Sequence, residues 1–291
     1  MKHLKRPLSL VLSLLLLLGL LSAGACASGY TDAGKIAHTD AVALLTALKV
    51  VQPKADGSFG PDEPVTRAGM ARLICTVLGG LFGPVEEASP APYGDTAGHP
   101  DEPYISYCAA HGIAAGRGDG SFDPDGAATV SEAVKMTLVA LGIDPGLFEF
   151  TGRDWQINVD TKANQVGLYR DFPQLNTSLP ITRDEAALLL CNALQAYVLE
   201  PDGTDGGATL LKRRYAVAYY DGELKSAQDG VLILAAAEKD HREITPVELT
   251  FADRGGDYAA LVGAQVRIFT YDSTPESGGL AVEVLFALDG T

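Results

Sequence analysis

The sequence predicts an α + β multidomain protein, in which a bundle of three helical repeats is followed by a small all-β barrel or sandwich. Three observations lead to this prediction. A loop-and-helix motif stands at Asp56–Gly79 and again at Asp119–Gly142, and its second half recurs at Ile181–Leu194. After residue 209 apolar and polar residues alternate, which is the period of strands. The composition, with 47% hydrophobic residues, is that of a folded chain.

The prediction divides the 291 residues into successive segments. They are a signal peptide at 1–27, copy one of the repeat at 28–80, copy two at 91–142, copy three at 146–198, a linker at 199–208 and a small β domain at 209–291. Each copy is predicted to form a helix, a loop and a second helix. Because one such unit buries little apolar surface, we expect the three copies to pack around a shared core.

The first 27 residues have the pattern of a secretory signal peptide. Three basic residues precede an apolar run at Leu8–Leu21, which is short for a membrane span, and small residues follow it. The spacing favours cleavage after Ala27, which gives a secreted chain with no membrane span in its mature form. Lipid attachment at Cys26 is the alternative, although Ala23 stands where a leucine is usual.

Net charge and residue spacing limit the classes of partner. The full chain carries −15, and removal of residues 1–27 takes away three positive charges and leaves −18. Nucleic acid demands a basic face, so we expect no nucleic-acid partner. The segment from Ser121 to Glu132 fits part of a calcium-binding loop, but serine stands at the first position, where aspartate belongs. We therefore expect no metal and no cofactor.

The second helix of each copy has one apolar face. In copy one the apolar residues recur at i, i+3, i+4, i+7 and i+8, at Met70, Leu73, Ile74, Val77 and Leu78. Cys75 and Cys191 occupy the same repeat position, and copy two has Leu138 there. Since cysteine and leucine interchange at this position, we expect both cysteines to be small buried hydrophobes. Cys108, on another predicted helix, is expected to be one as well.

Each second helix is predicted to begin at a threonine, namely Thr66, Thr129 and Thr182. Threonine is a favourable N-cap because its hydroxyl can accept an unpaired backbone N–H. Glu132 and Glu185 stand three residues after the threonine in copies two and three, which completes a capping box. Copy one has Gly69 at that position, so its first turn should be weaker by about 1 kcal/mol or less.

An arginine follows the capping threonine in two of the copies. Arg67 and Arg183 stand there in copies one and three, and Val130 in copy two. A cation at a helix N-terminus is mildly unfavourable, so capping does not explain the arginines. Together with the free N–H groups of the first turn, an arginine can form an anion site. Alternatively, its stem covers the neighbouring helix and its charge lies in water. Spacing alone does not choose between these interpretations.

Residues 209–291 contain five runs that are typical of strands, at 215–226, 230–236, 246–251, 264–272 and 280–288. Short, closely spaced strands suggest a small barrel or sandwich, of the OB-like kind. The segment has a single histidine, His241, and no nucleophile that pairs with it. We therefore interpret this domain as a spacer or an interaction domain rather than an enzyme.

The three repeats resemble the surface-layer homology (SLH) module of bacterial cell-envelope proteins. The family's pattern is an early aspartate, a helix, a "GI..G..DG.F.P" loop and a second helix that begins with "TRAE". Copy one reads "DGSFGPDEPVTRAGM" and copy two reads "GIAAGRGDGSFDPDG". Copy three closes with "ITRDEAA" but lacks the "DG.F" loop.

The resemblance implies a pseudo-threefold helical bundle that binds the anionic, often pyruvylated, polysaccharide attached to peptidoglycan. It makes Arg67 and Arg183 candidate ligands of that sugar, together with Asp32 and Asp95 at the early aspartate and Trp155 at an aromatic position of the family. Because copy two lacks the arginine, we expect at most two competent grooves. An acidic chain can hold an acidic sugar through local arginines, since salt screens more distant charges beyond roughly 8–10 Å.

The function that the resemblance implies is non-covalent anchoring to the cell wall. The chain would then be a secreted, non-enzymatic protein of the wall or S-layer of a Gram-positive-type bacterium, displaying its β domain. Two alternatives stay open. One is a wall-acting hydrolase whose activity lies in the β domain or in a longer parent chain. The other is a lattice or adhesion protein whose modules mainly self-associate.

Overall fold

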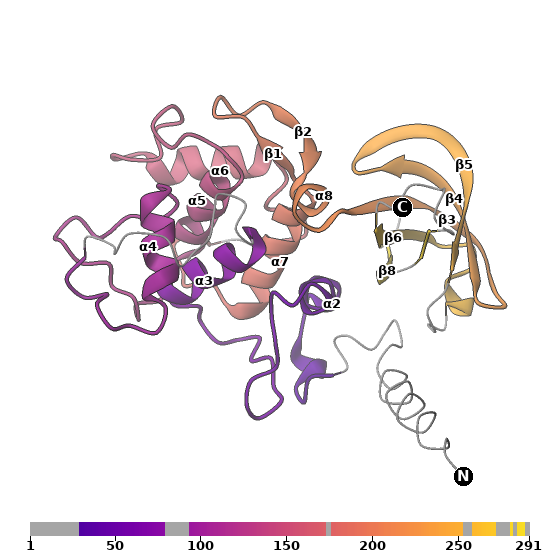
Figure 1. The fold of residues 1–291 in the computed structure, drawn as a ribbon, viewed down its shortest axis with the longest axis horizontal. Coiled ribbons are helices and arrows are strands. Elements are labelled where there is room, and N and C mark those ends of the chain that lie inside the picture. The colour runs from indigo at the N-terminus through magenta and orange to yellow at the C-terminus, as the bar shows by residue number, and fades with distance from the viewer. Residues whose placement is uncertain are drawn as a thin grey trace, which may run out of the picture. The chain divides into compact units, whose positions relative to one another are not determined.

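The computed structural model describes residues 29–78, 93–172, 176–252, 258–271, 280–281 and 284–288. The expected signal peptide at 1–27, Cys26 included, lies outside these residues. The chain forms two compact units, one from Tyr30 to Ala218 and the other from Tyr219 onward (Figure 1). In the described part of the chain, no helix combines the length and the apolar character needed to cross a membrane.

The first unit contains a pair of helices from each copy, and the predicted helices are confirmed. After a 3₁₀ turn, η1, the pairs are α2 and α3 in copy one, α4 and α5 in copy two, and α6 and α7 in copy three. Their bounds are η1 Ala33–Lys35, α2 Thr39–Ala47, α3 Arg67–Leu78, α4 Glu102–Ala110, α5 Val130–Ala140, α6 Trp155–Gln165 and α7 Arg183–Gln195. The second helix of each copy packs on the first helix of the next, α3 on α4, α5 on α6 and α7 on α2.

The three copies meet at the centre of this unit in cyclic order. The backbone N–H of Val65 donates to the carbonyl of Ile181, Ile181 donates to Ala128, and Ala128 donates back to Val65, each over 2.9 Å. These residues stand directly before the capping threonines. Helices α3, α5 and α7, which follow them, contact one another. The structure therefore has the pseudo-threefold arrangement, and the helix pair of copy three takes the third place in it.

The helix caps form as the residue pattern predicts. The Thr129 hydroxyl accepts the N–H of Glu132 over 3.2 Å, and the Glu132 carboxylate accepts the N–H of Thr129 over 2.9 Å. Thr182 and Glu185 form the same pair of bonds over 3.2 and 2.8 Å. In copy one the capping threonine accepts the N–H of Gly69 over 3.0 Å, and glycine offers no carboxylate in return.

The core of the helical unit is built from the apolar helix faces and from the loops between helices. Phe59 and Phe122, the phenylalanines of the two "DG.F" loops, are 1% and 0% exposed. Cys75, Cys108 and Cys191 are all buried, as predicted for small hydrophobes.

Residues 199–208 are not the linker that we expected. They belong to an antiparallel hairpin that follows α7, and a short helix comes after it. The bounds are β1 Tyr197–Leu199, β2 Asp205–Thr209 and α8 Leu210–Tyr215. The first compact unit therefore continues to Ala218, beyond the predicted start of the β domain at residue 209.

Packing against the helices explains why this segment is ordered. The N–H of Leu199 donates to the carbonyl of Leu141 over 2.7 Å. Gly142 permits this approach, since its φ is +114° and a Cβ there would lie 2.1 Å from the oxygen of Leu199. At the end of α8, the Tyr215 hydroxyl donates to the carbonyl of Val77 on α3 over 3.3 Å. The turn-rich sequence forms the tip of the hairpin.

The second unit is a sheet whose strand order is β7-β5-β4-β3-β6-β8. Strands β3, β4 and β5 pair antiparallel in sequence, β8 pairs antiparallel with β6, and β7 runs parallel to β5. All five predicted strands are present, the last one as β7 and β8. The bounds are β3 Val217–Gln228, β4 Val231–Lys239, β5 Arg242–Ala252, the 3₁₀ turn η3 Ala259–Leu261, β6 Gln265–Tyr271, β7 Leu280–Ala281 and β8 Val284–Ala287.

The prediction was a small barrel or sandwich; the sheet is open, so the closed barrel is wrong. Within the described residues β7 and β8 end the strand order and do not pair with each other. The strand β5 shows the physical reason. A barrel strand places every second residue inside, but the one buried residue of β5 is Phe251. Its charged and polar side chains leave most of this strand facing solvent.

Candidate functional site

Arg67 and Arg183 each bridge two copies of the repeat. Arg67 begins α3 of copy one, and its Nε donates to the carbonyl of Phe122, in the loop of copy two, over 2.9 Å. Arg183 begins α7 of copy three, and its Nε donates to the carbonyl of Phe59, in the loop of copy one, over 2.7 Å. Each guanidinium also lies over the ring of that phenylalanine, at 4.6 and 5.0 Å from the ring centre.

The third boundary, between copies two and three, lacks both partners of this contact. Helix α5 begins at Val130 instead of an arginine, and the N–H of Val130 donates to the carbonyl of Leu179 in copy three over 3.0 Å. The loop to which Leu179 belongs has no "DG.F" sequence. The missing arginine and the missing loop therefore belong to one and the same boundary.

Arg67 is held by every nitrogen of its guanidinium. Besides the bond from Nε, its Nη1 donates to the Glu132 carboxylate over 3.1 Å and its Nη2 to the carbonyl of Ala115 over 2.7 Å. Its side chain is only 7% exposed. Burial lowers the pKa of Arg67, and the charge of Glu132 opposes that shift. Arg67 is therefore a structural bridge between copies.

Arg183 uses fewer of its hydrogen-bond donors than Arg67. Its Nε is bonded to Phe59, whereas its Nη1 and Nη2 make no hydrogen bond or ion pair with any residue in the described ranges. Burial lowers the pKa of Arg183, and the nearby charge of Glu63 opposes the shift. At this boundary the arginine keeps two nitrogens that can donate to a ligand.

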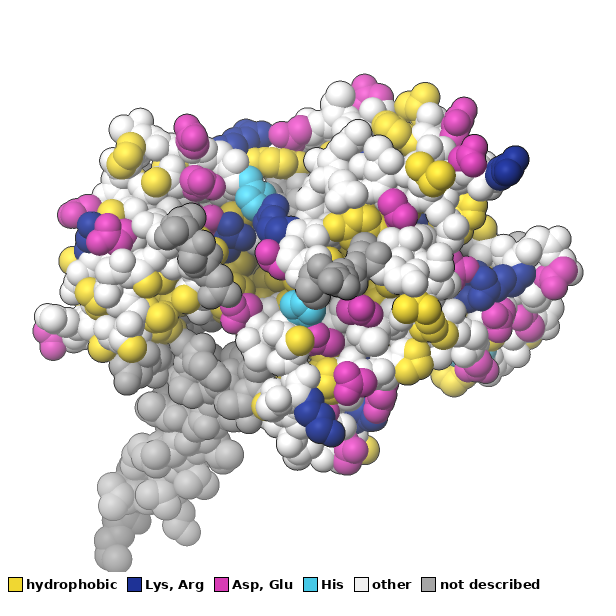
Figure 2. All heavy atoms as spheres, turned by 180° about the vertical axis from the view of Figure 1, so that it is seen from behind, with side chains coloured by type: hydrophobic (Ala, Val, Ile, Leu, Met, Phe, Trp, Pro, Cys, Tyr) yellow, Lys and Arg dark blue, Asp and Glu magenta, His cyan; other side chains and the backbone are white. Residues whose placement is uncertain are grey.

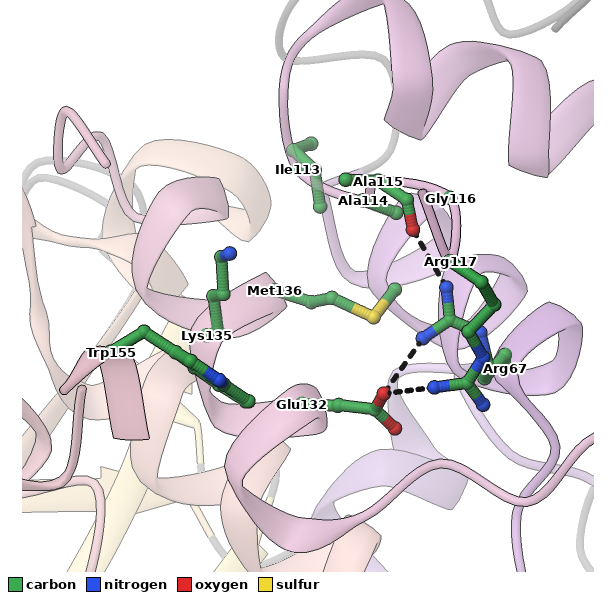
Figure 3. Close-up of a pocket in the computed structure, with 10 residues that line it drawn as sticks. All are labelled: Arg67, Ile113, Ala114, Ala115, Gly116, Arg117, Glu132, Lys135, Met136 and Trp155. Carbon is green, nitrogen blue, oxygen red and sulfur yellow. Dashed lines mark hydrogen bonds and ion pairs between the residues drawn. The ribbon is translucent and has the colours of Figure 1, made fainter. Parts of the chain in front are cut away.

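A cavity of about 240 Å³ lies beside Arg67, and all three copies contribute to its walls. Figure 3 shows the Trp155 ring and the two guanidinium groups on opposite sides of it, with Met136 and Glu132 between them. The lining comes from the start of α3, the loop after α4, helix α5 and the start of α6. The residues are Arg67, Ile113, Ala114, Ala115, Gly116, Arg117, Glu132, Lys135, Met136 and Trp155.

The lining is locally basic in an acidic chain. Three of its side chains are cationic and one, Glu132, is acidic, whereas acidic side chains are spread over the molecular face in Figure 2. Arg117 donates from Nη1 to Glu132 over 2.5 Å and from Nη2 to Asp123 over 3.0 Å. Glu132 therefore receives bonds from both arginines. This acid is neutralised, and each of the two arginines is partly used in neutralising it.

Among the three cations that line the cavity, Lys135 is the one whose donors are not used by the described residues. Its ammonium lies 5.3 Å from the centre of the Trp155 ring, and it makes no hydrogen bond or ion pair with the residues that the structure describes. Burial lowers the pKa of Lys135, the charge of Arg67 adds to this effect, and Glu132 opposes it. A bound anion would relieve this unfavourable environment.

Asp32 and Asp95 do not line the cavity. The Asp32 carboxylate accepts the N–H groups of Phe59 and of the following residue, both over 2.8 Å. Asp95 accepts the N–H of Phe122 over 2.8 Å and that of the following residue over 2.7 Å. These backbone bonds lower the pKa of both carboxyl groups. Each aspartate holds the loop of its own copy, and both of its oxygens are used for that purpose.

Of the five candidate ligands, the cavity brings together two, Arg67 and Trp155. Glu132, which the sequence identifies as a cap, also takes part in the cavity's ion pairs. Sequence reasoning missed Lys135 and Arg117. The spacing could have indicated Lys135, because it stands three residues after Glu132 and so on the same face of α5. Arg117 lies in the loop after α4, where periodicity carries no signal.

The described part of the second unit contains a structural ion pair. Arg267 on β6 donates from Nε and Nη2 to the two oxygens of Asp221 on β3, over 2.7 and 2.5 Å. Both side chains are largely buried, so the pair fixes neighbouring strands. Among the described residues of the chain, no group of His, Cys, Asp and Glu is arranged to hold a metal ion.

Comparison with known families identifies two of the repeats. The family model of the S-layer homology domain matches residues 29–71 and 92–133. These ranges cover most of copy one and copy two, and they include the loops and the starts of α3 and α5. Copy three lies outside the matched ranges.

Three relatives have names that refer to the bacterial cell surface or cell wall. A "Cell surface protein" of Thermoanaerobacter kivui is 27% identical over 93% of this chain and 35% of its own length. A "Middle cell wall protein" of Brevibacillus brevis is 28% identical over 55% of this chain and 15% of its own. An uncharacterized cell wall amidase of Bacillus anthracis is 32% identical over 37% of this chain and 21% of its own. The chain thus spans about a third or less of each relative.

Proposed function

Since the chain is an S-layer homology domain protein, we propose that it is a cell-surface protein held non-covalently on the wall of a Gram-positive-type bacterium. In this proposal the helical unit binds an anionic, pyruvylated sugar of the polysaccharide attached to peptidoglycan. The chain has no catalytic role, and its β unit is displayed at the surface.

The observation that carries this proposal is the chemistry of the cavity beside Arg67. Its volume, about 240 Å³, is below the range of about 300–1,000 Å³ that is common for drug-sized ligands. It therefore suits one sugar residue rather than a long segment of polymer. Trp155 offers an aromatic face for the apolar side of a sugar ring, and Lys135 offers unpaired donors for a carboxylate.

The boundary between copies three and one supports a second site. Arg183 has two nitrogens free of partners among the described residues and lies over Phe59. The boundary that begins at Val130 has neither the arginine nor the loop. We therefore propose two binding grooves with different cations, Lys135 in one and Arg183 in the other.

The relatives support the location rather than the ligand. The match with the cell surface protein of T. kivui extends over 93% of this chain, so it includes the sheet as well as the repeats. The match with the middle cell wall protein of B. brevis covers a smaller share. Both names agree with a protein that works in the envelope.

Co-sedimentation with purified walls tests the proposal. The mature chain should pellet with intact Gram-positive walls and stay soluble when the anionic polysaccharide has been removed. Lys135→Gln should weaken pelleting about tenfold or more, because a hydrogen bond to a charged group is worth about 1.5–3 kcal/mol. Lys35→Gln is the matched control, since it removes the same charge at an exposed position of η1.

Two outcomes would contradict the proposal. If the chain pellets equally with intact and stripped walls, the polysaccharide is not its ligand. If Lys135→Gln and Lys35→Gln bind like the wild type, the cavity is not the binding site, even if the chain is a wall protein.

A wall-acting hydrolase is the second candidate, favoured by the similarity to the cell wall amidase of B. anthracis. The same walls give the test. Release of soluble peptide or amino-sugar fragments by the purified chain, growing with time, would favour the enzyme. Pelleting without such release supports the anchor.

A further inference from the structure

Two cysteines from different copies face each other inside the helical unit. Cys75 lies on α3 of copy one and Cys108 on α4 of copy two, and their sulfur atoms are 3.6 Å apart. Their exposed fractions are 2% and 0%. A disulfide bond is about 2.05 Å long, so each sulfur needs to move by only about 0.8 Å. The sequence gives no sign of this pair, because the cysteines occupy unrelated repeat positions.

The surroundings keep the two sulfurs together. Each thiol points toward a backbone carbonyl of the other helix, Cys75 toward Tyr104 and Cys108 toward Ala71, both over 3.8 Å. The ion pair of Arg72 on α3 with Asp101, the residue before α4, lies along the same helix contact at 3.1 Å. The pairing is therefore a property of the packed helices.

We propose that Cys75 and Cys108 form a disulfide bond that staples copy one to copy two when the chain folds outside the cytoplasm. A small-molecule or protein disulfide serves as the oxidant. The thiolate of one cysteine attacks a sulfur of the oxidant, which releases one thiol and leaves a mixed disulfide. The second thiolate attacks that mixed disulfide and releases the other thiol. Two electrons pass from the cysteine pair to the oxidant, and the two cysteine protons end on the released thiols.

The burial of the two cysteines determines when the disulfide bond can form. In the packed protein the hydrogen bond with Cys75 and the apolar surroundings raise the pKa of Cys108 well above its ordinary value. Because the thiolate is the reactive form, exchange is slow once α4 has docked on α3. The bond therefore closes during folding. Once formed, the disulfide bond holds α3 against α4. This helix contact borders the cavity, since Arg67 begins α3 and the loop after α4 lines the same cavity.

Cys191 provides an internal control. It occupies the repeat position of Cys75, but the sulfur accepts a hydrogen bond from the side-chain amide of Gln195 over 3.2 Å. Cys191 is therefore expected to remain a thiol under conditions in which the other two pair.

The test uses the full chain with Cys26→Ser, so that three cysteines remain. The chain is reduced, unfolded and refolded in a mixture of reduced and oxidised glutathione, then blocked with maleimide and mapped by peptide mass spectrometry. We expect a linked Cys75–Cys108 peptide and a maleimide on Cys191. Chain that is refolded under reductant and then moved to the same mixture should link far more slowly.

The bond should also be visible in stability. Closing a loop of this length is expected to raise the Tm of the helical unit by about 8–15 °C relative to the reduced chain. Cys191→Ala should keep this difference, and Cys75→Ala should abolish it. Maleimide on both Cys75 and Cys108 after oxidative refolding, or a link that involves Cys191, would overturn the proposal.

Discussion

Replacing each arginine by alanine should have very different effects on stability, although the two hold equivalent repeat positions. Arg67 donates three hydrogen bonds, to Phe122, Glu132 and Ala115, and covers a phenylalanine ring. Arg183 donates one bond, to Phe59, and covers its ring at a similar distance. The comparison therefore isolates the two additional bonds of Arg67.

The magnitudes follow from ordinary values for these contacts. A hydrogen bond contributes about 1 kcal/mol, one to a charged group somewhat more, and a cation over a ring about 0.5–1 kcal/mol. Arg67→Ala should therefore cost about 4 kcal/mol and Arg183→Ala about 2 kcal/mol. No further penalty for an isolated buried charge is added to the first figure, because Arg117 still pairs with Glu132 in the variant.

Urea unfolding followed by tryptophan fluorescence measures this difference. The chain has one tryptophan, Trp155, and it lies in the helical unit beside the cavity. The signal therefore reports this unit separately from the sheet. If the free energies of unfolding of the two variants agree within about 0.5 kcal/mol, the extra bonds of Arg67 do not stabilise the fold and the reasoning fails.

Three further predictions concern other contacts of the helical unit. His38 donates from Nδ1 to the Asp184 carboxylate over 2.6 Å, and this bond raises the pKa of His38 above 6.5. The stabilisation by this pair is therefore full below pH 6.5 and is lost as pH rises through the raised value. His38→Asn should flatten the change of urea midpoint between pH 6 and 8, and an unchanged slope would exclude this pair as its source. Gly69→Glu should complete a capping box and stabilise by about 1 kcal/mol in the same assay, whereas Gly69→Gln should gain less. Asp95→Ala should speed amide hydrogen exchange at Phe122, and equal exchange in variant and wild type would contradict the role of Asp95 in the loop.

Features that depend on neighbouring residues could be predicted from the sequence. A capping box needs a threonine and a glutamate three residues apart, so Thr129 with Glu132 was sufficient to predict it. Helix faces and strands depend on the spacing of apolar residues, and all five runs predicted as strands were found as strands, the last one divided into β7 and β8. The segment 199–208 shows the limit of such reasoning. Turn residues are equally suited to a linker and to the tip of a hairpin. The contact that decides between the two is the bond from Leu199 to Leu141, which is distant in the sequence.

Contacts between copies could not be predicted, because they join residues whose repeat positions differ. Arg67 bonds to a phenylalanine 55 residues later, and Cys75 meets a cysteine 33 residues later. Asp32 and Asp95 illustrate the same limit from the other direction. The family pattern indicates that they matter, and the structure shows both carboxylates holding backbone N–H groups of the loops. A repeated residue can thus have a role in the architecture that its repetition alone does not reveal.

The two arginine boundaries differ because one of them contains a carboxylate. At both boundaries a phenylalanine carbonyl holds Nε, which fixes the plane of the guanidinium. At the first boundary Glu132 then takes Nη1 of Arg67 and also binds Arg117, so both arginines belong to an internal network and Lys135 carries the uncompensated charge. At the second boundary no carboxylate of the described residues reaches Arg183, and the arginine itself keeps free donors. Equivalent positions therefore differ in their bonding: Arg67 is fixed in an internal network, whereas Arg183 keeps two nitrogens without a partner among the described residues, according to the acid that stands beside them.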